Sequence, residues 1–192
     1  PFSFPSRYLY ALQLVHTRVR SFGTTSIGRL FDTAAALLGF TREVTFEGQA
    51  AMWLERLASH STVIDAYPFP FTGDELDFHP LLEGIIRDRL QGRDTCKIAR
   101  AFQRGIAEGL RNAVATLCRA HRVDTVVLSG GVFQNELLLH DLGSLLEPER
   151  LQTWTNHVVP SNDGGISLGQ ATLAAFANSE SGAYSKKLTL RG

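Results

Sequence analysis

Two short turns rich in glycine are the parts of this sequence whose residue types and spacing suit chemistry. They are SGG at 129–131 and NDGG at 162–165, and an apolar run with helical spacing follows each of them. Glycine has no side chain, so its backbone allows a ligand to approach closely. Unpaired N–H groups at the start of a helix favour anions. The turns therefore predict an anion-binding surface at the carboxyl end of a strand.

Two acidic residues near such positions have more than one interpretation. Asp163 can cap the helix that follows it, or it can point into a cleft as an oxygen ligand for a metal. The residue type by itself favours the cap. Asp32, close to Gly28 in a predicted helix, either faces water at the helix margin or is buried for a purpose, and water is the simpler interpretation. Neither glycine turn matches the GxxxxGK[ST] or GxGxxG phosphate-binding patterns.

Other reactive residue types lack the neighbours that catalysis or metal binding requires. The six histidines show no HxxxH or HExxH spacing, and Ser129 is not part of a GxSxG elbow. Cys96 and Cys118 form no CxxC pair, so we interpret them as reduced, buried residues of a cytoplasmic protein. The sequence therefore assigns no catalytic residue.

The composition is that of an ordinary globular domain. Of the 192 residues, 44% are hydrophobic, and 19 basic residues balance 19 acidic ones. This balance gives no electrostatic reason to expect nucleic acid or an anionic membrane as a partner. No apolar run approaches the ~20 residues of a membrane helix, and no signal-peptide pattern opens the chain.

Hydrophobic spacing predicts the elements that position the two turns. Helices are expected at 26–38, 47–60, 79–92, 95–121 and 135–147 and late in 158–176, with short strands within 61–78 and at 124–128 and 150–155. Gly105 and Gly109 should allow the 95–121 helix to pack closely against another element, while its basic residues should face water. The order predicts an α/β fold with a small sheet and several helices.

The ends of the chain look different from its middle. Residues 1–24 are expected to form an irregular lead, residues 25–178 the folded domain, and residues 179–192 a flexible polar tail. The chain begins with proline in an aromatic stretch, so we expect a fragment of a longer protein or a processed chain.

Four motifs in order resemble the HypF family of carbamoyltransferases, which mature [NiFe]-hydrogenases. They are SIGRLFDTAAALLGF (26–40), VTFEGQAAMWLE (44–55), SGGVFQNELLL (129–139) and VPSNDGGISLGQA (159–171). The resemblance is to the carboxyl-terminal portion of that family, which is akin to the ATPases that make threonylcarbamoyladenosine on tRNA. It implies the second lobe of a two-lobed actin/Hsp70/sugar-kinase-like fold.

The resemblance also implies a reaction and its site. In this family ATP and carbamoyl phosphate give carbamoyl-adenylate in another domain, and the region resembled here passes the carbamoyl group to the carboxyl-terminal cysteine of an acceptor protein, HypE. By position, Gly130 and Gly131 would contact the nucleotide with Asn135 as a polar neighbour. Gly28 and Asp32 would approach the ribose hydroxyls.

The resemblance further implies that Asp163 binds a divalent metal of the Fe or Zn class. The family's metal site also needs histidines from an HxxxH-type motif, which this sequence lacks. Phe46 stands where the family usually has tyrosine, Gln103 stands where histidine is common, and residues 1–22 do not resemble the family. We therefore expect an incomplete metal site and a chain that is inactive alone.

Two other functions remain open. The chain can be a related nucleotide-binding carbamoyltransferase with another acceptor, such as tRNA adenosine or a small molecule. It can also be a non-catalytic interaction module, which the missing metal histidines favour. Adenylate binding separates the enzyme interpretations from the interaction module.

Overall fold

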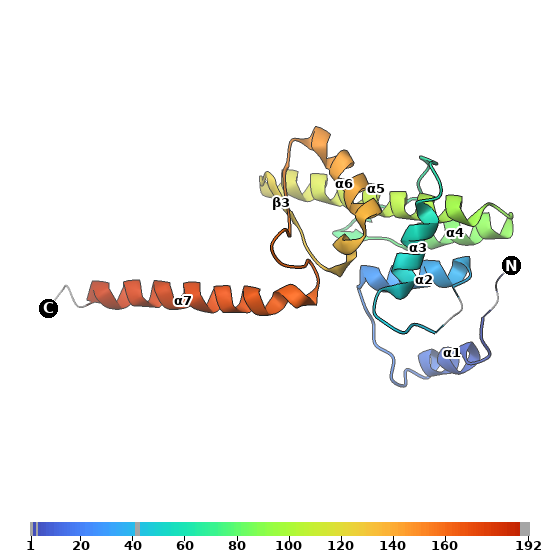
Figure 1. The fold of residues 1–192 in the computed structure, drawn as a ribbon, viewed down its shortest axis with the longest axis horizontal. Coiled ribbons are helices and arrows are strands. Elements are labelled where there is room, and N and C mark those ends of the chain that lie inside the picture. Colours follow the sequence, from blue (N-terminus) through green and yellow to red (C-terminus); the bar gives the residue numbers. More distant parts are fainter. Residues whose placement is uncertain (1, 3, 41–42, 189–192) are drawn as a thin grey trace. The chain divides into compact units, whose positions relative to one another are not determined.

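The computed structural model describes residue 2, residues 4–40 and residues 43–188. The chain divides into two compact units, one made of residues 1–126 and 135–153 and the other of residues 127–134 and 154–192. The expected α/β class with small sheets and several helices is confirmed (Figure 1). Across the described part of the chain, no helix is long and apolar enough to cross a membrane.

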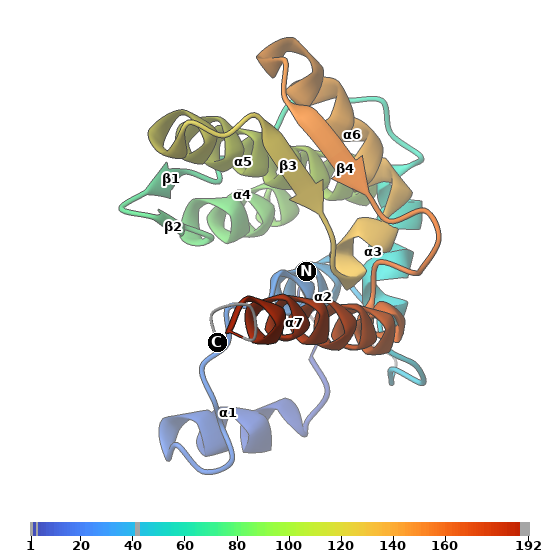
Figure 2. The same cartoon turned by 90° about the vertical axis from the view of Figure 1, so that its left-hand side faces the viewer.

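The first unit is mostly helical. Its helices are α1 (Tyr8–His16), α2 (Ile27–Leu38), α3 (Gln49–Ala58), α4 (His79–Leu90), α5 (Thr95–His121) and α6 (Glu136–Leu146). Helix α5 spans the predicted residues 95–121, because the Asp94 side chain accepts hydrogen bonds from two backbone N–H groups of its first turn. Helices α2, α3, α4 and α6 pack against α5, and Figures 1 and 2 show α4 beside it.

The core of the first unit lies along one stripe of α5. Ile98, Phe102 and Ile106 on this helix are fully buried, as the apolar spacing predicts. The ring of Phe31 on α2 meets that of Phe102 edge to face, with 5.3 Å between the ring centroids. Ser26 stands at the N-cap position of α2, but its side chain makes no capping hydrogen bond.

Four short strands form two pairs among the described residues. β1 (Phe71–Thr72) and β2 (Glu75–Leu76) make an antiparallel hairpin, which confirms the strands expected within 61–78. β3 (Thr125–Leu128) and β4 (Gln152–Thr155) are hydrogen-bonded neighbours, and Figure 2 shows their arrows running in the same direction. Helix α6 and the 3-10 turn η2 (Glu147–Glu149) make the crossover between these parallel strands.

The extended segment before β1 crosses α5 where the helix has small residues. A Cβ atom on Gly105 would lie 2.4 Å from the carbonyl oxygen of Tyr67, and one on Gly109 would lie 2.5 Å from that of Phe69. The Tyr67 N–H also donates to the carbonyl of Ala101 at 3.2 Å. The close packing predicted at Gly105 and Gly109 is therefore confirmed.

A polar network fixes the same segment to α4. The Tyr67 hydroxyl donates to Asp88 at 2.7 Å, and Arg93 joins Asp88 at 2.7 Å and Asp65 at 2.6 Å. Burial and the bond to Asp88 raise the pKa of Tyr67 above its ordinary value. Its phenol therefore remains a neutral hydrogen-bond donor at any physiological pH.

The prediction that the basic residues of α5 face water is wrong for two of them. Arg100 forms a two-point ion pair with Asp141 of α6, at 2.5 and 2.9 Å, and its side chain is 13% exposed. Arg104 joins Glu108 at 2.9 Å and approaches the same Asp141. A buried carboxylate on α6 required these partners, and helical spacing within α5 alone does not reveal it.

The two ends of the chain also differ from expectation. Helix α1 lies inside the expected irregular lead, and most of its residues are apolar, so no one-sided apolar stripe marks it in the sequence. In the second unit, η1 (Gly131–Gln134) and η3 (Asp163–Gly165) precede the long helix α7 (Ile166–Leu188). Helix α7 continues into the expected tail, because polar residues without proline do not end a helix. Residues 189–192 of that tail lie outside the described part.

Two helical glycines give a matched test of the crossing at α5. We expect Gly105→Ala to lower the free energy of unfolding by about 1–3 kcal/mol or more, because its methyl group would overlap backbone that cannot move aside. Gly143→Ala on α6 meets nothing within 4 Å and should stabilise the fold by up to about 1 kcal/mol. Urea unfolding measures both, and equal effects of the two substitutions would contradict the proposed crossing.

Asp88 predicts a pH dependence of stability. Burial would raise the pKa of this carboxyl, but hydrogen bonds from Arg93 and Tyr67 and the charge of Arg93 outweigh burial and hold the pKa below its ordinary value. Such a group stabilises the fold above the unfolded-state pKa of about 3.9, and this stabilisation is lost as the pH falls through the folded-state pKa. We expect Asp88→Asn to cost about 1–3 kcal/mol near neutral pH and progressively less below about pH 4.

Urea unfolding at a series of pH values measures that difference. The control is Glu75→Gln on the exposed strand β2, which should change the free energy of unfolding by less than about 0.5 kcal/mol at each pH. If Asp88→Asn lowers the free energy of unfolding as much in acid as at neutral pH, the charge of Asp88 does not explain its contribution to stability.

Candidate functional site

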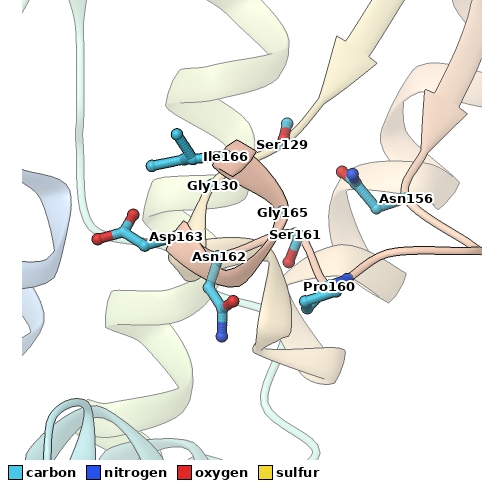
Figure 3. Close-up of a pocket in the computed structure, with 9 residues that line it drawn as sticks. All are labelled: Ser129, Gly130, Asn156, Pro160, Ser161, Asn162, Asp163, Gly165 and Ile166. Atoms are coloured by element: carbon cyan, nitrogen blue, oxygen red, sulfur yellow. The ribbon is translucent and has the colours of Figure 1, made fainter. Parts of the chain in front are cut away.

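The two glycine turns meet in the second unit. The backbone N–H of Gly130 donates to the carbonyl oxygen of Ser161 at 2.8 Å. A Cβ atom on Gly131 would lie 3.8 Å from the Cβ of Asn162, which is ordinary contact. The turns enclose a pocket of about 270 Å³ (Figure 3). Its lining residues are Ser129, Gly130, Asn156, Pro160, Ser161, Asn162, Asp163, Gly165 and Ile166.

Glycine is required in both turns for different reasons. Gly130 has a φ of +106°, which L residues with a side chain rarely adopt, and it has open space around it. Gly165 instead packs inward, since a Cβ there would lie 2.8 Å from the carbonyl oxygen of Pro160. Gly130 therefore shapes the open surface of the pocket, and Gly165 closes the second turn on itself.

The second turn is capped by Asn162 and not by Asp163. The Asn162 side chain accepts from the Gly164 N–H at 3.0 Å, and its carbonyl accepts from the Gly165 N–H at 3.0 Å. The capping interpretation of the Asp163 carboxylate is therefore wrong. Asp163 is exposed in the pocket lining, and the described residues provide its carboxylate with no hydrogen bond or ion pair (Figure 3).

Some of the N–H groups near the helix starts, where the sequence predicts an anion site, already have partners. At the start of α6, Glu55 accepts from the Leu137 N–H at 3.1 Å and Asn135 accepts from the Leu138 N–H at 2.8 Å. The N–H groups of Gly164 and Gly165 are engaged within their own turn. These four donors are therefore not available to an anion, and an anion site at the other N–H groups of the turns stays a prediction.

The remaining predicted residues do not line this pocket. Gly131 lies in the second unit, and Gly28, Asp32 and Asn135 lie in the first. Asn135 is the N-cap of α6, and its side-chain nitrogen is buried without a hydrogen-bond partner among the described residues. Asp32 on α2 pairs with Arg29 one turn earlier at 2.9 Å, and its side chain is 32% exposed. Asp32 therefore stands at the helix margin, the simpler of its two interpretations. Gly28 lies in the same helix, and a Cβ atom there would lie 3.5 Å from the Ser26 hydroxyl oxygen, which is ordinary contact.

Sequence reasoning missed most of the polar groups in the pocket. They are Ser129, Asn156, Ser161 and Asn162. A signal was present for two of them, because Ser129 directly follows β3 and Asn156 directly follows β4. The carboxyl ends of neighbouring parallel strands lie at one edge of a sheet, where ligands bind in α/β folds.

The described residues do not fit a metal site. No group of three or more His, Cys, Asp or Glu side chains gathers in that part of the chain. A single carboxylate such as Asp163 does not define the coordination geometry of a divalent ion of the Fe or Zn class. Cys96 is no better placed for nucleophilic chemistry, since burial and the charge of Asp94 raise the pKa of its thiol.

Comparisons with known proteins give a consistent result. The family model described as carbamoyltransferase, Kae1-like domain, second subdomain, matches residues 4–170. The match begins inside the lead that we expected to lie outside the family. The carbamoyltransferase HypF of Synechocystis is 35% identical over 152 residues, which are 77% of this chain and 19% of that protein. The HypF of Rhodobacter capsulatus is 32% identical over 166 residues, 86% of this chain and 21% of its own length.

Solved structures agree with the sequence matches. A crystal structure of full-length HypF in the phosphate- and nucleotide-bound form superimposes with a TM-score of 0.81 at 35% identity, covering 88% of this chain and 23% of that one. HypF from T. kodakarensis gives a TM-score of 0.79 at 25% identity. The chain thus spans about a fifth of the length of the relatives that it matches. It belongs to the HypF carbamoyltransferase family, as the second subdomain of the Kae1-like domain.

Proposed function

We propose that the pocket between the glycine turns binds carbamoyl-adenylate during carbamoyl transfer in [NiFe]-hydrogenase maturation. The observation that carries the proposal is the Gly130 N–H to Ser161 carbonyl bond, which joins the two turns into one pocket wall. Family membership supports it, because the curated relatives are carbamoyltransferases and a similar structure holds phosphate and nucleotide. In this proposal the setting is cytoplasmic, in keeping with the two free cysteines.

The chemistry follows from the groups that line the pocket. Gly130 provides an open backbone surface against which the sugar-phosphate part of an adenylate can lie. Ser129 and Ser161 offer hydroxyl groups that make no hydrogen bond to the described residues. The adenylate phosphate carries one negative charge, so neutral donors can satisfy it without a basic side chain.

The transfer step that we propose uses a thiol acceptor. The sulfur of the carboxyl-terminal cysteine of a HypE-type protein attacks the carbamoyl carbon, so that a C–S bond forms. The bond from that carbon to the phosphate oxygen breaks, AMP leaves, and the thiol proton is released. Carbamoyl phosphate and ATP supply the adenylate in an earlier step that takes place in another domain of the relatives.

The support for the proposed roles of the other predicted residues differs from one residue to the next. Gly28 and Asp32 remain proposed contacts of the ribose hydroxyls, on the family resemblance alone. Asn135 remains a proposed polar neighbour of the nucleotide on the family resemblance alone, because its carboxamide oxygen is engaged as a cap and its nitrogen is buried. We assign Asp163 no metal-dependent step, because the described residues do not complete a coordination site.

A pair of glycines with matching backbone tests the site. Gly130 and Gly39 have φ values of +106° and +109°, and neither would place a Cβ within 4 Å of another group. Alanine should therefore strain both positions to a similar extent, by about 1–2 kcal/mol. We expect Gly130→Ala to weaken AMP binding, measured by calorimetry, at least about tenfold. Gly39→Ala, at the carboxyl end of α2, should leave binding unchanged.

Denaturant unfolding of both variants checks that the strain is comparable. Equal affinity of Gly130→Ala and the parent for AMP would contradict the proposed site. Absence of any heat with AMP for the parent chain would favour the non-catalytic interaction module instead.

Activity gives a further prediction. We expect the purified 192-residue chain, supplied with ATP and carbamoyl phosphate, to show no pyrophosphate exchange above background. The pocket lining contains no basic side chain to neutralise a triphosphate, and the family resemblance places adenylate formation elsewhere. A full-length HypF relative serves as the positive control. Sustained pyrophosphate exchange by this chain would show that it also forms the adenylate, which contradicts a role limited to carbamoyl transfer.

A further inference from the structure

The charge of the pocket lining limits which part of a ligand can occupy it. Of the nine lining residues, Asp163 is the one with a charged side chain. The polar remainder consists of two serine hydroxyls and the carboxamides of Asn156 and Asn162. A group with several negative charges would find no compensating cation in this lining. The lining suits a neutral group that both donates and accepts hydrogen bonds.

Asn156 is the carboxamide in this lining that has both of its polar atoms available. Asn162 has its side-chain oxygen engaged by the Gly164 N–H. For Asn156, the described residues provide no hydrogen bond to either side-chain atom. Between these two residues, Asn156 is therefore the better candidate for contact with a ligand.

Asn156 directly follows β4, and its side chain is exposed. The polar groups of its two neighbours lie within hydrogen-bond distance of each other, since the Thr155 hydroxyl and the His157 ring nitrogen Nε2 are 3.1 Å apart. Neither of these groups occupies a polar atom of Asn156. Figure 3 shows its carboxamide turned into the pocket from the end of β4.

We infer that Asn156 is a specificity-determining residue that recognises the carbamoyl group of the ligand. A carboxamide offers one donor and one acceptor side by side, and a carbamoyl group offers the complementary acceptor and donor. The two groups can form a pair of hydrogen bonds that an acetyl group, with methyl in place of the amino group, cannot complete. The inference rests on the proposed function, since it assigns one part of the same ligand.

A carboxamide also pairs with the edge of adenine, so the base is the competing assignment for Asn156. The two assignments differ in what they predict for AMP, which has the base but lacks the carbamoyl group. Removing the carboxamide should leave AMP binding unchanged in the carbamoyl assignment and weaken it in the adenine assignment.

The test uses calorimetry with three probes on the 192-residue chain. The first is adenosine 5′-(carbamoylmethyl)phosphonate, in which a methylene replaces the bridging oxygen so that no transfer occurs. The second is its 2-oxopropyl counterpart, which has a methyl group in place of the amino group, and the third is AMP. We expect the parent chain to bind the first probe at least about tenfold more tightly than the second.

Asn156→Leu should abolish that difference and leave AMP affinity within about twofold of the parent. The matched control is Gln152→Leu, which removes an exposed carboxamide from β4 outside the pocket and should preserve the difference. Equal loss of AMP and carbamoyl-probe affinity in Asn156→Leu, or equal binding of the first two probes by the parent, overturns the inference while nucleotide binding stands. Failure of the parent to bind any probe overturns the proposed function itself.

Discussion

The backbone hydrogen bond from Gly130 to Ser161 is the contact on which the candidate site depends. It joins the segment after β3 to the segment after β4. At the same residue the backbone is left-handed, with open space where a Cβ would lie, so glycine suits both the turn and the exposed surface. The glycines therefore first determine the shape of the two turns. The exposed backbone surface that a ligand could contact is a consequence of that shape.

The candidate polar residues differ in whether their side chains already have hydrogen-bond or ion-pair partners within the protein. The side-chain oxygens of Asn135 and Asn162 and the carboxylate of Asp32 each have a defined partner in the fold, which is a structural role for each group. Asn156 and Asp163 have no such partner among the described residues, although both line the pocket. Both side chains are exposed, so their polar atoms are open to water or to a ligand, and the proposed roles of these two residues rest on their place in the pocket lining.

The sequence predicts the span of a helix well where one side of that helix is apolar and buried. The span of α5 could be predicted because its apolar stripe and Asp94 cap are both local signals. Most residues of helix α1 are apolar, so no single stripe stands out and periodicity does not detect it. At the site, the sequence indicates the two turns, but the residue type favours Asp163 as the cap, whereas Asn162 provides it. Which neighbour reaches a backbone N–H depends on a few tenths of an ångström, and spacing along the chain does not encode this.

Charge gives a reason why activation and transfer would occur at separate places. ATP and carbamoyl phosphate carry several negative charges between them, and in the pocket they would meet Asp163 with no basic side chain in the lining. Carbamoyl-adenylate carries one charge and ends in a neutral group, so neutral donors and acceptors are sufficient for it. The same lining that would bind the adenylate is therefore poorly suited to forming it. In the proposed scheme the polyanionic substrates of the earlier step therefore do not compete with the adenylate for the pocket.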